Sequence, residues 1–192
     1  MPVPSNPKLS DIQAEFGGSN PIELTEYYSG GPLVPAGAPA PNGPIPSSGQ
    51  ISMGQFRGAE NVVFITATGG TVTDDGDFKV HKFTSPGTFT VTEVGNPAGS
   101  DTVEYLVVAG GAGGGYGNGG GGGGGAGGYR AATGQPVSVQ GYSITVGAGG
   151  GPNSGTGTPS VGVGITSARG GKGGATPSGP PGGPGGSGGG GG

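Results

Sequence analysis

The chain has 192 residues, of which 54 are glycine and 19 are proline, well above the roughly 7% glycine and 5% proline of average proteins. Its apolar residues amount to 29%, its charged residues to 9%, and its net charge is only −4. These values exclude an ordinary globule with one large core, a highly charged disordered chain and, because glycine does not recur at every third residue over most of the sequence, collagen.

Two short helices are expected within residues 1–31. The first covers 9–17 with Ser10 as its N-cap, and the second covers 20–30 with Asn20 as its N-cap. Ser, Thr, Asp and Asn are the side chains that best satisfy the free N–H groups at a helix start. Both segments are too short to be stable alone in water, so they need a surface to pack on.

The bulky apolar side chains of these helices allow two interpretations. They pack on each other or on the β region that follows, or they dock onto another protein. A Pro/Gly-rich linker over 32–58 separates them from the later strands, which favours docking; within it, Ser52 and Gln55 repeat the helix-start spacing. The candidate docking residues are Leu9, Ile12, Phe16, Ile22, Leu24, Tyr27 and Tyr28.

Residues 59–108 are expected to form a small antiparallel, β-sandwich-like unit. β-Branched and aromatic runs alternate with turn residues, and Asp74–Asp77 predicts a hairpin turn around Gly76. The most hydrophobic run, Val103–Val108, predicts a central strand. The other expected strands are 61–68, 71–73, 78–83 and 88–92.

Residues 109–169 alternate glycine runs with short strand-like segments, and residues 170–192 form a low-complexity Gly/Pro tail. Ordering a glycine costs about 0.5–1 kcal/mol more than ordering an alanine, so the glycine runs are either mobile loops or extended, polyproline II-like segments that pair through their backbones. The second alternative is favoured for part of the region, with other chains supplying the neighbours. The fold class expected overall is mainly β.

Catalytic and metal-binding chemistry is scarce. His81 has no second histidine or cysteine to act with, so a solvated strand position is favoured. Asp74–Asp77 lacks the spacing of a calcium loop, and Lys172 lacks the Ser or Thr that follows the lysine of a phosphate-binding loop. We therefore expect no enzyme, no cofactor and no metal. The acidic balance argues against nucleic-acid binding, and we expect neither a signal peptide nor a membrane-inserted segment.

Several phrases of the sequence resemble proteins of tailed, notably marine, bacteriophages. LSDIQAEFGGSNPIELTEYYSGG (9–31) and IPSSGQISMGQFRGA (45–59) are similar to the start of phage virion proteins. DGDFKVHKFTSPGTFTV (75–91), VEYLVVAGGAGGG (103–115), GGGAGGYR (123–130) and YSITVGAGG (142–150) are similar to the glycine-rich domain of tail fibres and adhesins. The resemblance implies a structural virion protein, commonly trimeric, attached to the tail by its N-terminal part.

The leading hypothesis is a tail-fibre-like protein whose residues 1–31 dock on a tail or baseplate protein and whose remainder contributes to host attachment. Candidate groups for binding a host-cell glycan are Tyr116, Asn118, Tyr129 and Arg130; for the last two, a plain strand start is an equal alternative. A head or tail decoration protein without receptor binding is the first alternative. An extracellular ice- or polysaccharide-binding protein is the second, and it ranks last because it predicts a secretion signal.

Overall fold

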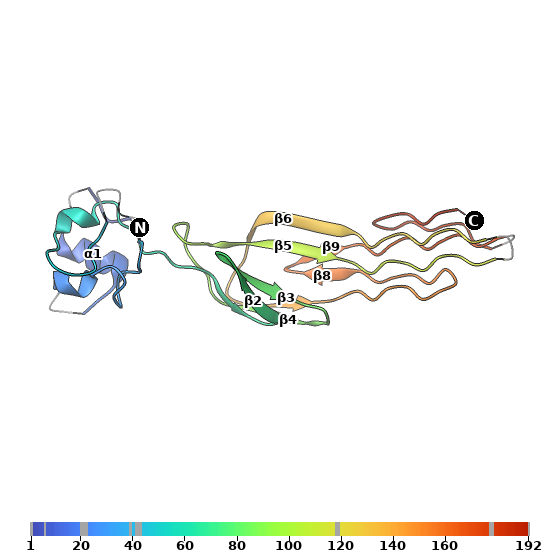
Figure 1. The fold of residues 1–192 in the computed structure, drawn as a ribbon, viewed down its shortest axis with the longest axis horizontal. Helices are drawn as coiled ribbons and strands as arrows, with labels where there is room; N and C mark the ends of the chain where they lie inside the picture. The colour runs from blue at the N-terminus through green and yellow to red at the C-terminus, as the bar shows by residue number, and fades with distance from the viewer. Residues whose placement is uncertain are drawn as a thin grey trace. The chain divides into compact units, whose positions relative to one another are not determined.

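The computed structural model describes residues 2–5, 7–19, 23–38, 40, 44–117, 120–176 and 179–191. The chain divides into two compact units, which are coloured in sequence order in Figure 1. The N-terminal unit comprises residues 1–65 and 95–101. The glycine-rich unit comprises residues 66–94 and 102–192.

The N-terminal unit contains one α-helix, α1 (Leu9–Phe16), and two short 3₁₀ helices, η1 (Leu24–Tyr27) and η2 (Met53–Phe56). Helix α1 begins earlier than the sequence predicts: Lys8, and not Ser10, is its N-cap, and the Lys8 N–H donates to a carboxylate oxygen of Asp11 at 2.7 Å. An acidic side chain at this position also faces the positive end of the helix dipole.

The starts of the two 3₁₀ helices differ in how well they match the sequence prediction. The Ser52 N–H donates to Gln55 Oε1 at 2.7 Å, which is the spacing that the sequence predicts. Glu23 is the N-cap of η1, whereas the sequence analysis expects the helix to begin at Asn20, which lies outside the described residues.

A single hydrophobic core holds the N-terminal unit together. Phe56 lies at its centre and makes edge-on ring contacts with Phe16 and Tyr27, with ring centroids 6.3 Å and 6.1 Å apart. Such aromatic pairs add to the stabilisation that comes from burial alone. The buried members of the core are Val3, Ile12, Phe16, Tyr27, Val34, Ile45, Phe56 and Ala59.

The segment expected as a linker, 32–58, is part of this folded unit. It supplies three of the buried side chains, Val34, Ile45 and Phe56. Hydrogen bonds also fix it to the preceding segment: the Tyr28 hydroxyl donates to the Gly49 carbonyl oxygen at 2.6 Å. A few buried apolar side chains spread among prolines are enough to anchor a Pro-rich segment to a core, although its composition alone is that of a spacer.

The strands in the described part of the glycine-rich unit are short and antiparallel. The first four are β1 (Thr66–Thr68), β2 (Thr71–Asp75), β3 (Phe78–Lys82) and β4 (Gly87–Glu93). The others are β5 (Thr102–Val108), β6 (Tyr129–Pro136), β7 (Gly141–Ile144), β8 (Ser160–Gly162) and β9 (Ile165–Ser167). They form one three-stranded sheet, β1-β4-β7, and three two-stranded sheets, β2-β3, β5-β6 and β8-β9.

The strand pattern confirms the mainly β fold class and corrects one detail of it. The predicted hairpin is present, with Asp75 opposite Phe78 and Gly76 at φ 59° in the turn. The expectation that Val103–Val108 is a central strand is wrong: β5 pairs with β6 alone, and Leu106 is 61% exposed. A run of apolar residues can alternate between a packed and an open face, and only Val107 of this run is buried.

Beyond the strands, the glycine runs form a hydrogen-bonded array of extended segments, drawn as adjacent unmarked ribbons in Figure 1. Segments 109–117 and 120–128 run antiparallel. The bonds between them are Ala109 N–H to Gly128 O, Ala112 N–H to Gly125 O and Gly115 N–H to Gly122 O, at N···O distances of 3.0, 2.9 and 2.8 Å. The donors therefore recur at every third residue, which is the repeat of a polyproline II helix.

The same period joins these two segments to a third. Segment 168–176 runs parallel to 109–117 and antiparallel to 120–128. It donates to the first from Gly170, Gly173 and Thr176 and accepts from the second at Ala168, Gly171 and Gly174. Residues 147–158 and 180–190 add further bonds on the outside. Each segment thus bonds in several directions, unlike a strand in a flat sheet.

Close approach of the backbones explains the choice of glycine. A Cβ at Gly115 would fall on the Gly174 carbonyl oxygen, and one at Gly127 would fall on that of Ala109. The neighbours of these segments come from the same chain. That other chains supply further neighbours stays a prediction. In its described residues, the supposed tail, 170–192, belongs to the array: N–H and C=O groups within 170–176 and 180–190 are paired with the other segments.

We predict that Phe56→Ala destabilises the N-terminal unit by about 3–5 kcal/mol, because a fully buried ring leaves a cavity. Urea unfolding followed by the NMR signals of Ile12 and Tyr27 measures the change. Phe64→Ala is the matched control, since the Phe64 ring is 63% exposed. Equal unfolding midpoints for the two variants would show that 32–58 is not part of the core.

We predict that Gly115→Ala disrupts the array, because its Cβ would overlap the Gly174 carbonyl; overpacking of this kind costs about 1–3 kcal/mol. Gly123→Ala is its control, since nothing lies within 4 Å of a Cβ there, and the loss of backbone freedom in the unfolded chain gives about 0.4–1 kcal/mol of stabilisation. Amide exchange at Gly122 and Gly125 reports both effects. Faster exchange in Gly123→Ala than in Gly115→Ala would contradict the close packing.

Candidate binding surfaces

Most of the predicted docking side chains are inside the N-terminal unit. Ile12, Phe16 and Tyr27 are buried, and Leu9 and Leu24 pack against the same core. Tyr28 is half-buried, and Ile22 lies outside the described residues. The buried side chains therefore pack on each other, which is the first of the two interpretations of the sequence. Docking of residues 1–31 onto another protein stays a prediction.

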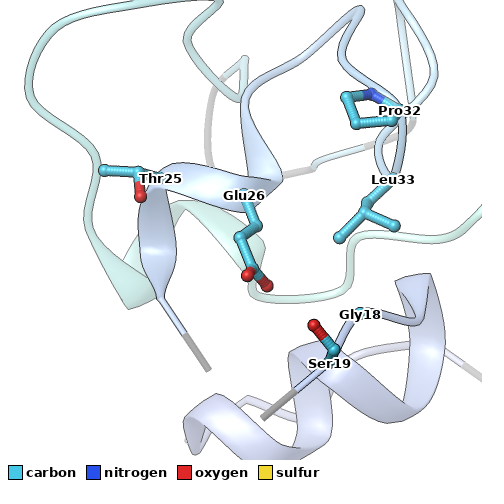
Figure 2. A pocket seen from close by; sticks show the side chains of 6 residues that line it. All are labelled: Gly18, Ser19, Thr25, Glu26, Pro32 and Leu33. Atoms are coloured by element: carbon cyan, nitrogen blue, oxygen red, sulfur yellow. The ribbon is translucent and has the colours of Figure 1, made fainter. Parts of the chain in front are cut away.

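One pocket opens on the surface of the N-terminal unit (Figure 2). Its volume is about 340 Å³, and its lining residues are Gly18, Ser19, Thr25, Glu26, Pro32 and Leu33. Glu26 belongs to η1, and the loop after α1 supplies Gly18 and Ser19. Glu26 is the one ionisable group among these six side chains.

Gly18 keeps this pocket open. Its φ is +117°, and a Cβ there would lie 2.8 Å from the Tyr27 hydroxyl oxygen and 3.2 Å from both Glu26 Oε2 and Leu33 Cδ1. A side chain at position 18 would therefore displace the groups that line the pocket wall. The Tyr27 hydroxyl donates its proton to the Gly17 carbonyl oxygen at 2.8 Å, so its lone pairs are left to accept.

The carboxylate of Glu26 is poorly compensated. Its Oε2 atom is buried and has no hydrogen-bond partner among the described residues. Burial of the ring, and then the negative charge of Glu26, raise the pKa of the neighbouring Tyr27 hydroxyl.

In the glycine-rich unit, Tyr116 lies near the end of segment 109–117 that is remote from the strands. Its ring is 59% exposed. Its carbonyl oxygen accepts a hydrogen bond from the Thr176 N–H at 3.0 Å, and the Thr176 hydroxyl donates to the Gly120 carbonyl oxygen, so the backbone under the ring is fixed. Asn118 lies outside the described residues.

Tyr129 and Arg130, the other two candidate glycan-binding residues, do not lie beside Tyr116 in the structure. Tyr129 begins β6 opposite Val108, so eight residues of extended chain, about 25 Å, separate this level from Tyr116. Arg130 is opposite Val107 and, since side chains alternate along a strand, belongs to the other face of the ladder. Tyr129 and Arg130 therefore do not form one site.

Tyr129 instead shares a sheet face with two side chains that the sequence analysis assigned to a core strand. Leu106, Val108 and Tyr129 are all more than half exposed, and we call them the β5–β6 apolar face. Along β5, the exposed residues Glu104, Leu106 and Val108 alternate with buried or half-buried ones. This alternation marks the exposed face. It is hard to see in the sequence because the residues that point to the opposite face are also apolar.

The remaining polar candidates have structural partners. His81 Nδ1 lies 2.8 Å from the Gly69 carbonyl oxygen, and its ring packs edge-on against Phe89. Asp74 forms an exposed ion pair with Lys79 across the β2-β3 hairpin. Within the described ranges, no group of three or more His, Asp or Glu side chains is placed to hold a metal ion. No helix in that part of the chain is long and apolar enough to cross a bilayer.

Comparison with known proteins identifies one family. The family described as "Glycine-rich domain" matches residues 84–192, which is more than half of the chain. The match covers β4 to β9 and the whole array of extended segments. No curated protein and no solved structure matches the chain.

Proposed function

This chain belongs to the glycine-rich domain family, and we propose that it is a structural virion protein of the tail-fibre type. In this proposal the N-terminal unit attaches to a tail or baseplate protein of a tailed bacteriophage. The glycine-rich unit projects away from the attachment point and contributes to binding of the host cell, with a surface glycan as its ligand.

The observation that supports this proposal best is the three-residue hydrogen-bond period of the array. Backbone bonds in several directions cross-link segments 109–117, 120–128 and 168–176 without a hydrophobic core. A unit of this kind holds its segments in place through backbone hydrogen bonds and needs very little side-chain material. Such properties suit a part that must hold a binding surface away from a particle.

The separate core of the N-terminal unit is the second support. Its buried side chains include Ile12 and Phe56. The described residues of this unit contribute no strand to the sheets β1-β4-β7, β2-β3, β5-β6 and β8-β9. A unit that folds around its own core can be recognised by a particle protein independently of what the glycine-rich unit binds. A homotrimer remains the assembly that we expect, with the virion tail as its location.

We predict that deleting residues 1–60 removes the protein from particles. The cut has to include the segment 32–58, because a deletion that ends at residue 31 would leave Val34, Ile45 and Phe56 without their core partners. Particle composition measured by mass spectrometry checks this, and the NMR spectrum of the truncated protein shows whether the glycine-rich unit still folds. Normal incorporation of a folded, truncated chain would refute the assignment of attachment to this unit.

We predict that Tyr116→Ala or Tyr129→Ala weakens binding of the purified protein to host cells by about tenfold, because exposed aromatic rings are frequent binding hot spots. Val139→Ala is the matched control, since Val139 is also more than half exposed. Fluorescence of labelled protein on the cells gives the apparent affinity. Wild-type protein that binds no host cell would instead support a purely architectural decoration protein.

A further inference from the structure

The net charge of the chain resides entirely in the N-terminal unit. This unit has six acidic and two basic side chains, a formal charge of −4, whereas the glycine-rich unit has five of each sign. Clustered charge of one sign steers association toward partners of the opposite sign. The acidic side chains of the unit are Asp11, Glu15, Glu23, Glu26, Glu60 and Asp101.

Among these carboxylates, Glu26 is distinguished by its position in the pocket of Figure 2. Its carboxylate group points toward Ser19, and the side chain of Leu33 lies beside it. One of its oxygens is removed from water and lacks a hydrogen-bond partner among the described residues. A carboxylate that has lost part of its hydration gains more from a cation than a fully solvated one does.

We propose that this pocket receives the ammonium group of a lysine side chain of a basic partner protein. The Glu26 carboxylate supplies the opposite charge. The Ser19 hydroxyl faces the Glu26 carboxylate in Figure 2 and can accept from another N–H group of the ammonium ion. Pro32 and Leu33 form an apolar wall that suits the methylene stem of lysine.

Lysine fits this site better than the other cations do. A guanidinium group is recognised through two parallel hydrogen bonds to one carboxylate, but Oε2 of Glu26 has no accessible surface. A calcium ion takes six or more oxygen ligands, and the described lining of the pocket includes a single carboxylate. A compact ammonium ion needs only one side of the carboxylate together with neutral acceptors.

The inference names the partner chemistry of the proposed attachment unit, and in that respect it rests on the proposed function. The pocket itself can be tested on the isolated full chain. The probe is Nα-acetyl-lysine N-methylamide, titrated into ¹⁵N-labelled protein at neutral pH and low ionic strength. We expect saturable shifts of the backbone amide signals of Gly18, Ser19 and Leu33. The norleucine analogue, which lacks the charge, gives none.

Glu26→Gln is the decisive variant because it removes the charge and keeps the shape. We expect it to weaken binding of the probe by about 10- to 100-fold, the range for a lost hydrogen bond to a charged group. Glu60→Gln is the matched control: it removes one negative charge from the same unit, and Glu60 does not line the pocket. The control variant is expected to bind the probe as wild type does, and both variants to keep the wild-type pattern of core signals.

The inference would be overturned by the absence of a saturable shift in the wild type, by equal affinity in Glu26→Gln, or by equal weakening in Glu60→Gln. Tighter binding of the arginine analogue than of the lysine probe would also refute the choice of lysine.

Incorporation into particles separates this inference from the proposed function. If the wild type and Glu26→Gln are both incorporated normally, the N-terminal unit still attaches the protein to the particle, but the pocket takes no part in that attachment. Absence of the wild type from particles rejects the function, while the titration still decides the chemistry of the pocket.

Discussion

The glycine-rich unit depends on one constraint, which is that backbone N–H and C=O groups removed from water must find partners. Segments with almost no side chains cannot bury enough apolar surface to be ordered by the hydrophobic effect. They are ordered instead by packing so closely that a carbonyl of one segment lies where a Cβ of the next would be, as Gly115 and Gly174 do. The three-residue repeat then gives each segment donors on several sides.

The N-terminal unit solves the same problem by the opposite route. It gathers a small number of large side chains around Phe56, and its short helices gain from that core the stability that they lack alone. Its surface carries the whole net charge of the chain. One molecule therefore combines an acidic, conventionally packed unit with a neutral array that is held by its backbone, and the two are suited to different kinds of partner.

Local chemistry in the sequence predicts much of the secondary structure. The Asp75-Gly76 turn fixes the β2-β3 hairpin, and Ser52 with Gln55 begins η2. Packing between residues that are far apart in the sequence is harder to predict. Nothing near Ile45 indicates that it meets Phe56 in a core, and β5 appears central until its partners are known. The sequence predicts the candidate site only in part. Glu26 lies between two predicted docking residues, but local sequence patterns do not indicate that Gly18 and Leu33 line a pocket with it.

Amide hydrogen exchange of the full chain at decreasing protein concentration tests the central claim, that a single chain closes the glycine array on itself. Protection is expected at Ala109, Ala112 and Gly115 and at Gly122, Gly125 and Gly128, because these N–H groups donate within the array. The account predicts that this pattern is unchanged on dilution. Exchange at the rate of an unstructured peptide, or protection that is lost on dilution, would contradict it.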